Sequence, residues 1–146
     1  MKIGFLLLSI LPIFGFSQTS EEDLVKSTVN QLFNGMKTSD SVLIRKSFSK
    51  NAVLQTITKA GEVKNENIND FVLSISKAEK QSLDERIIFS NILIDGNLAS
   101  VWTPYEFYYK GQFSHCGVNS FQLVKSNNEW KIQYIIDTRR KDNCRK

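Results

Sequence analysis

Hydrophobic residues in the first half of the chain recur at intervals of three and four, the spacing of one face of a helix. One such series follows a capping-box pair, Thr19 and Glu22, and predicts an amphipathic helix: Val25, Val29, Leu32 and Met36. A second, short helix is predicted after the three capping residues that end at Asp40. A third is predicted to begin at Asn67 or Asn69, with one apolar face: Ile68, Phe71, Val72 and Ile75.

The second half of the chain is dominated by sequence typical of β-strands. A β-branched stretch at 52–58 predicts one strand, and longer stretches predict four more at 86–94, 98–109, 113–125 and 130–138. Short turns separate the last four: Asp95-Gly96, Lys110-Gly111 and residues 126–129. The predicted fold class is therefore α+β, with three N-terminal helices packed on a strongly curved antiparallel sheet.

The turn lengths also predict which strand residues share a face. Three pairs set the register: Ile94 with Asn97, Tyr109 with Gln112, and Lys125 with Trp130. The predicted core face then includes the following side chains: Asn91, Leu93, Trp102, Glu106, His115, Asn119, Phe121, Leu123, Ile132 and Tyr134. The predicted outer face includes others: Ile88, Ile92, Val101, Tyr105, Cys116, Val118, Ile135, Asp137 and Arg139. This outer face is too apolar for full solvation, so we expect a homodimer that forms through it.

Residues 1–17 have the pattern of a signal peptide. Lys2 precedes an apolar run at 3–16, shorter than the roughly 18 residues of a membrane-spanning helix. Gly15 and Ser17 provide the small residues of a cleavage site before Gln18. We expect an exported protein, periplasmic or secreted, with no membrane contact after cleavage and one domain at 18–146. An uncleaved N-terminal anchor is the alternative.

The composition narrows the possible chemistry. The chain has 146 residues, 41% of them hydrophobic and 23% charged, which is typical of a folded domain. One histidine and two cysteines are too few for the common protein-only zinc sites, and no Gly-rich phosphate loop is present, so we expect no metal and no cofactor. The net charge of +4 is modest, acidic residues interrupt the basic C-terminus, and export removes nucleic acid from reach. We expect a solvated tail and no nucleic-acid partner.

Export favours a disulfide between Cys116 and Cys144. The predicted register places Cys116 opposite Arg139, so that a tail turning back after Arg140 brings the two sulfur atoms together. Two independent thiols are the alternative.

The order of elements resembles the NTF2-like superfamily, the ketosteroid-isomerase-like and SnoaL-like cone. Residues 102–108 and 111–118, with the tail at 130–140, are similar to exported bacterial NTF2-like proteins often labelled "putative lumazine-binding". This resemblance implies a pocket between helices and sheet and frequent dimers, and it does not imply one chemistry. The steroid-isomerase mechanism is not expected, because residues 54–57 lack the carboxylate of that branch.

The predicted register opposes Glu106 and His115 on the core face, where a carboxylate can orient an imidazole for acid–base catalysis. Asn91, Asn119 and Tyr134 are predicted to hydrogen-bond a ligand there. The alternative is an ordinary cross-strand ion pair.

Aromatic residues give a second set of candidates. Trp102, Phe121 and Tyr134 are predicted to stack on a flat, apolar ligand, and the alternative is that they fill the core. We therefore expect an exported domain that binds a small, partly apolar molecule. An isomerase or dehydratase-type lyase using Glu106 and His115 is the alternative function, and a structural domain with a filled cone is a third.

Overall fold

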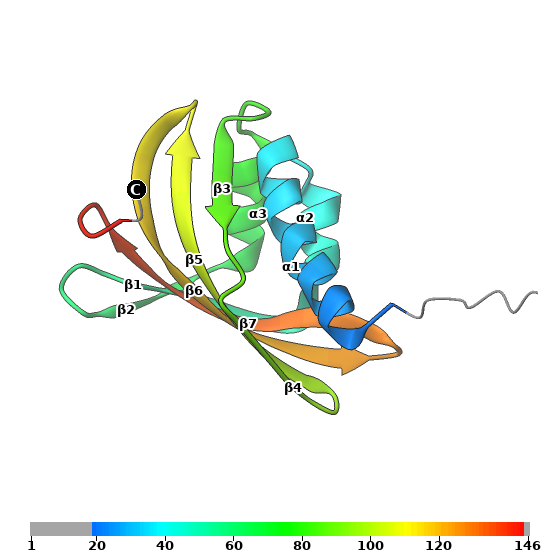
Figure 1. The fold of residues 1–146 in the computed structure, drawn as a ribbon. Helices are drawn as coiled ribbons and strands as arrows, with labels where there is room; N and C mark the ends of the chain where they lie inside the picture. The colour runs from blue at the N-terminus through cyan, green and yellow to red at the C-terminus, as the bar shows by residue number, and fades with distance from the viewer. Residues whose placement is uncertain (1–18, 145–146) are drawn as a thin grey trace, which may run out of the picture.

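Three helices lie together on one side of a long curved sheet (Figure 1). The structure is a computed structural model that describes residues 19–144, so the predicted signal peptide lies outside the described residues. The helices are α1 (Glu21–Thr38), α2 (Ser41–Ser47) and α3 (Ile68–Ser76). Among residues 19–144, no helix is both long and apolar enough to cross a membrane.

Each helix begins at a side chain that accepts hydrogen bonds from the backbone N–H groups of the first turn. Ser20, rather than Thr19, caps α1, with the N–H of Asp23 donating to its hydroxyl. Asp40 caps α2, as predicted, and Asn67 caps α3, which decides between the two predicted asparagines. These local signals placed all three helices correctly.

The sheet has seven strands: β1 (Phe48–Ile57), β2 (Val63–Glu66), β3 (Leu83–Ile87), β4 (Asn91–Asp95), β5 (Leu98–Tyr109), β6 (Gln112–Ser126) and β7 (Glu129–Arg140). Their order is β2-β1-β7-β6-β5-β3, and β4 also pairs with β5. The prediction of a wholly antiparallel sheet was wrong at one place, because β1 and β7 are parallel. Parallel neighbours need a long crossover, and turn signals between consecutive strands do not report such a pairing. The single strand predicted at 86–94 is divided into β3 and β4, and β2 was not predicted.

The predicted register was wrong beyond two β-bulges. Tyr109 does pair with Gln112, but a shift next to Phe107 makes that residue oppose His115, while Glu106 opposes Cys116. A second shift, between Gln122 and Leu123, changes the faces along the C-terminal half of β7. A bulge inserts one unpaired residue, so every later side chain exchanges faces relative to the partner strand. The β4–β5 turn was also misplaced by one residue, since Asp95 pairs with Leu98.

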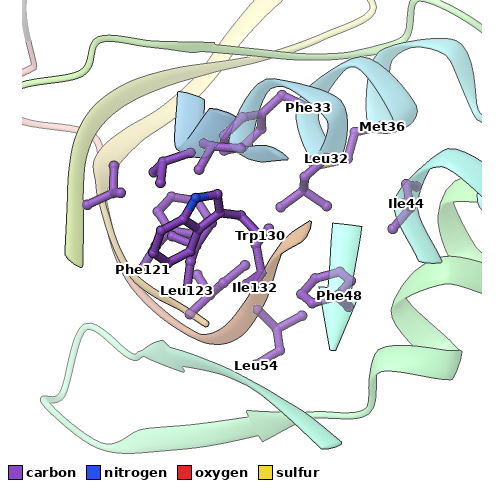
Figure 2. Close-up of a cluster of buried hydrophobic side chains, with 14 of the residues drawn as sticks. Leu32, Phe33, Met36, Ile44, Phe48, Leu54, Phe121, Leu123, Trp130 and Ile132 are labelled. Carbon is purple, nitrogen blue, oxygen red and sulfur yellow. The ribbon is translucent and has the colours of Figure 1, made fainter. Parts of the chain in front are cut away.

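The core occupies the concave side of the sheet beneath α1 and α2 (Figure 2). Its largest fully buried side chains include Phe121, Leu123, Ile132 and Ile44. Phe33 of α1 meets Phe121 edge to face, with ring centroids 6.1 Å apart. The N-terminal half of α1 covers the filled end of the sheet, while Phe33 and the last turn of α1 reach a cavity at the other end.

Candidate functional site

A cavity of about 250 Å³ lies between the concave face of the sheet and helices α1 and α3. Most of its wall is apolar: Leu32, Phe33, Met36, Leu54, Phe71, Ile75, Leu83, Phe107, Phe121 and Ile135. Polar side chains also reach it: Glu66, Ser74, Glu85, Tyr105, His115, Asn119, Asp137 and Arg139. A concave, mostly apolar space with a few convergent polar groups is the usual form of a small-molecule site.

Glu85 of β3 and Asn119 of β6 form the first polar group. The Asn119 side-chain amide donates to Glu85 Oε1 at 2.8 Å, and Asn119 is only 6% exposed. Burial raises the pKa of Glu85 to about 7, against the lowering effect of the Asn119 hydrogen bond, and the negative charge of Asp137 raises it further. At neutral pH the cavity wall therefore holds a carboxyl group that can both donate and accept a proton.

Asp137 of β7 is the centre of the second polar group. It is 7% exposed, and Arg139 Nε donates to its Oδ2 at 2.9 Å. The Tyr105 hydroxyl lies 3.2 Å from the same oxygen, and Arg139 Nη2 also donates to Glu66 at 3.4 Å. Burial, followed by the charges of Asp137 and Glu85, raises the pKa of Tyr105. Tyr105 is therefore a neutral hydrogen-bonding group at physiological pH.

His115 of β6 lies between aromatic side chains at the rim. Its ring centroid is 5.1 Å from that of Phe107 and 5.7 Å from that of Tyr105, and its Nδ1 is 3.0 Å from Ser114 Oγ. Burial lowers the pKa of His115, and the positive charge of Arg139 lowers it further. The imidazole is therefore neutral at pH 7, and which of its nitrogens donates depends on the tautomer.

Three of the predicted site residues reach the cavity: His115, Asn119 and Phe121. Four do not line it: Asn91, Trp102, Glu106 and Tyr134. The observed pairings place them on the face of the sheet away from the cavity or on an exposed part of a strand.

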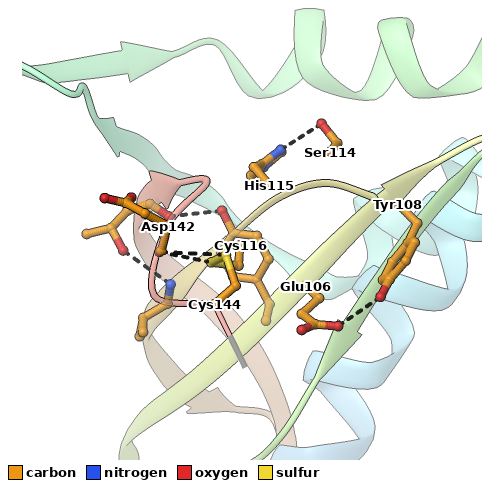
Figure 3. The surroundings of a disulfide bond; sticks show 10 residues. Glu106, Tyr108, Ser114, His115, Cys116, Asp142 and Cys144 are labelled. Atoms are coloured by element: carbon orange, nitrogen blue, oxygen red, sulfur yellow. Dashed lines mark hydrogen bonds between the residues drawn. A yellow bond between two sulfur atoms is a disulfide. The ribbon is translucent and has the colours of Figure 1, made fainter. Parts of the chain in front are cut away.

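The surroundings of these four residues agree with that placement. Glu106 accepts a hydrogen bond from the Tyr108 hydroxyl at 2.9 Å, away from His115 (Figure 3). Tyr134 donates to Gln55, and Trp102, which is 48% exposed, pairs with the exposed Asn91. The predicted Glu106–His115 pair is therefore not formed.

Six polar residues of the cavity were not among the predicted site residues: Glu66, Ser74, Glu85, Tyr105, Asp137 and Arg139. Glu85 was left out because the predicted strand began one residue later, and Tyr105, Asp137 and Arg139 were assigned to the outer face. The even-numbered residues of β5 include Ser100 and Glu106, whereas no odd-numbered one is charged, so the strand's own pattern favoured the observed face over the one that the turns predicted. A register allowing a bulge beside residue 114 would have found Tyr105.

A disulfide joins Cys116 of β6 to Cys144 of the tail (Figure 3), as predicted, with Cα atoms 5.7 Å apart. Disulfides persist in oxidising compartments, so this bond agrees with the expectation of an exported protein. Within residues 19–144, no group of three His, Cys, Asp or Glu side chains is placed to hold a metal ion.

Solved structures of similar fold come from several bacteria. An NTF2-like protein of unknown function from Shewanella baltica OS155 is 18% identical, with a TM-score of 0.67 over 84% of this chain and 98% of that one. An NTF-2 like protein of unknown function from Silicibacter pomeroyi DSS-3 is 15% identical, with a TM-score of 0.65 over 80% and 93%. A cystatin-like domain of unknown function from Nostoc punctiforme PCC 73102 is 14% identical, with a TM-score of 0.66 over 85% and 80%. These likenesses establish the fold.

Sequence comparison is more specific than these structural likenesses. A search of curated proteins gave no match. A family model described as "Putative lumazine-binding" matches residues 20–134, which span α1 through the first half of β7. The helices and curved sheet have the fold of the NTF2-like structures, and because the family match covers most of the chain, the chain belongs to the family described as "Putative lumazine-binding".

Proposed function

We propose that the protein is an exported domain that binds a small, flat, partly apolar molecule in its cavity. The observation that carries this proposal is the cavity itself, whose wall is mostly apolar and is interrupted by polar side chains that come mainly from the strands. Small-molecule sites in proteins combine these two features, because burial of apolar surface supplies affinity and a few polar groups fix orientation.

The volume limits the size of the ligand. Ligand pockets usually hold about 300 to 1,000 Å³, and this cavity, at about 250 Å³, lies just below that range. Phe33, Phe107 and Phe121 present aromatic rings to the space, which suits the face of another ring. A one- or two-ring heterocycle is the proposed class.

The polar groups suggest a neutral ring with hydrogen-bonding edges. The positive charge of Arg139 is offset by Asp137, so this pair adds little net charge to the wall. Below about pH 7 the Glu85 carboxyl is protonated, and it can then donate one hydrogen bond while accepting another. An N–H next to a carbonyl on the edge of a ring complements both of these functions.

Lumazine is the appropriate first probe. The family to which the chain belongs is described by binding of this compound, a flat two-ring heterocycle with N–H and carbonyl groups on its edge. Its chemistry agrees with the apolar walls and with the Glu85–Asn119 pair. We propose lumazine-like heterocycles as ligands on this combined ground.

Export and dimerisation complete the proposal. The signal-peptide pattern at 1–17 and the Cys116–Cys144 disulfide support a periplasmic or secreted location. Trp102 is 48% exposed and Val53 43%, and an exposed aromatic residue on a sheet favours contact with a second copy. We propose a homodimer through this outer face, and no nucleic-acid or membrane partner. Catalysis by Glu106 and His115 is not proposed, because their side chains lie on opposite faces.

Filling the cavity is the most specific test of binding. In Ser74→Trp an indole replaces a small side chain that lines the cavity, whereas Ser76→Trp makes the same change on the same helix, at a position that is likewise exposed but does not line the cavity. Lumazine fluorescence is titrated with wild type and both variants, with thermal unfolding as a check of folding. We expect saturable binding by wild type and Ser76→Trp, and at least about a tenfold loss of affinity in Ser74→Trp.

Equal binding by Ser74→Trp and Ser76→Trp would contradict the cavity as the site. Absence of saturable binding by folded wild type would contradict lumazine as a ligand of the proposed class.

A further inference from the structure

A basic groove lies at the rim of the cavity, and the proposed function leaves it unused. Its lining comes from three parts of the chain: Lys59, His115, Arg139, Arg140, Lys141 and Asp142. Lys59 follows β1, whereas Arg139 and Arg140 end β7 and the next two residues begin the tail. Figure 1 shows the C-terminal end beside the tip of the β1–β2 hairpin, in agreement with this shared lining.

Positive charge predominates in the groove. Four of its lining side chains are cationic, and Asp142 is the one carboxylate among them. Arg139 has carboxylate partners, Asp137 and Glu66. In the part of the chain that the structure describes, Lys59, Arg140 and Lys141 form no ion pair. Three cations without a carboxylate partner therefore surround one opening.

The groove and the cavity share part of their walls. His115 and Arg139 line both spaces, so a molecule whose ring occupies the cavity can extend a substituent past them into the groove. The positive charges of Arg139 and Lys141, after burial, lower the pKa of His115, which agrees with a positive potential at this opening. The neutral ring site thus has a charged entrance.

The disulfide positions one side of the groove. Lys141 and Asp142 lie between the end of β7 and Cys144, which is bonded to Cys116 of β6. This bond gives the tail that carries Lys141 a second covalent connection to the sheet, in addition to the end of β7. The disulfide therefore maintains the charge arrangement of the groove in addition to stabilising the fold.

We propose that this groove binds an anionic group, a carboxylate or a phosphate, carried by the molecule whose ring lies in the cavity. The ligand class is thereby narrowed from a flat neutral heterocycle to one with an acidic substituent. This inference rests on the proposed function, since the ring site supplies the other half of the binding.

Two probes that differ by one charge test the groove. Lumazine and lumazine-6-carboxylate are titrated at low ionic strength into wild type with its disulfide intact. We expect the carboxylate to bind about tenfold more tightly, because several partly exposed charges each contribute modestly. Added salt should reduce this preference, because it screens exposed charges.

Paired lysine variants locate the effect. The double variant Lys59→Gln/Lys141→Gln should bind both probes equally, whereas the control Lys77→Gln/Lys80→Gln, altered at exposed lysines outside the groove, should keep the preference. Cys144→Ser should reduce the preference for the carboxylate and leave lumazine affinity unchanged.

The outcomes separate this inference from the proposed function. Equal affinity of wild type for both probes would contradict anion binding by the groove and leave ring binding intact. A preference for the carboxylate that survives in Lys59→Gln/Lys141→Gln would do the same. If neither probe binds, the proposed function fails. Inorganic phosphate then tests anion binding by the groove in the absence of a ring ligand. Phosphate should then raise the unfolding temperature of wild type more than chloride of equal ionic strength does. The absence of that difference, or its persistence in the double lysine variant, overturns the groove as well.

Discussion

Replacing Glu85 by Gln should stabilise the protein at alkaline pH, although Glu85 belongs to the proposed binding site. The substitution keeps the size of the side chain and a carbonyl oxygen that can accept from Asn119, while removing the ionisable group. Burial and the nearby negative charge of Asp137 disfavour the ionised form of this carboxyl in the folded protein.

The magnitude follows from the pKa of Glu85, which folding raises from 4.5 to about 7. The folded protein then binds more protons than the unfolded chain between these values, so the stabilising contribution is complete below pH 4.5 and is lost as the pH rises through about 7. A shift of this size corresponds to about 3 kcal/mol. Glu85→Gln should therefore resemble wild type near pH 4.5 and exceed its free energy of unfolding by up to about 3 kcal/mol near pH 8.

Urea unfolding of both proteins at the two pH values, with the disulfide intact, measures this difference. Glu62→Gln, which removes a carboxyl from an exposed turn, is the control and should change the free energy of unfolding by less than about 0.5 kcal/mol. A Glu85→Gln effect that is the same at both pH values would contradict a raised pKa of Glu85 in the folded protein. It would mean that the Glu85 carboxyl is not destabilised by burial.

Three further changes test other parts of the structure. Gly117→Ala should lower the free energy of unfolding by at least about 2 kcal/mol in urea titration, because the added methyl group would overlap a backbone carbonyl oxygen of β7. An unchanged midpoint would contradict this packing. Breaking the Cys116–Cys144 bond should lower the free energy of unfolding by about 3 to 4 kcal/mol, given the sequence separation of 28 between the cysteines. A loss below about 1 kcal/mol would show that the tail is held by other contacts. Trp102→Glu should convert the proposed homodimer to monomer in sedimentation analysis. The control Leu73→Glu, on the exposed side of α3, should leave the dimer intact. A monomeric wild type would rule out this interface.

Local signals explain what could be predicted from the sequence. The caps at Asp40 and Asn67 act within one helical turn, so the sequence alone determines where those helices begin. The alternation along β6 also placed His115, Asn119 and Phe121 on the correct face, because one strand needs no register to define its two sides.

The remainder of the site depends on interactions between distant residues. A bulge next to Phe107 and another in β7 decide that Tyr105 and Asp137 face the cavity and that Glu106 does not. The even-numbered residues of β5 include Ser100 and Glu106 and the odd-numbered residues include no charged residue, but the register taken from the turns outweighed this difference. Bulges are frequent beside binding sites because they reorient side chains, which is their effect here.

A crystal structure of the protein with lumazine would locate the ligand. We expect the ring between α1, α3 and the sheet, in contact with Phe121 and with its polar edge directed to Glu85 and Asn119. Lumazine bound only outside this cavity, or a cavity closed by side chains, would contradict it.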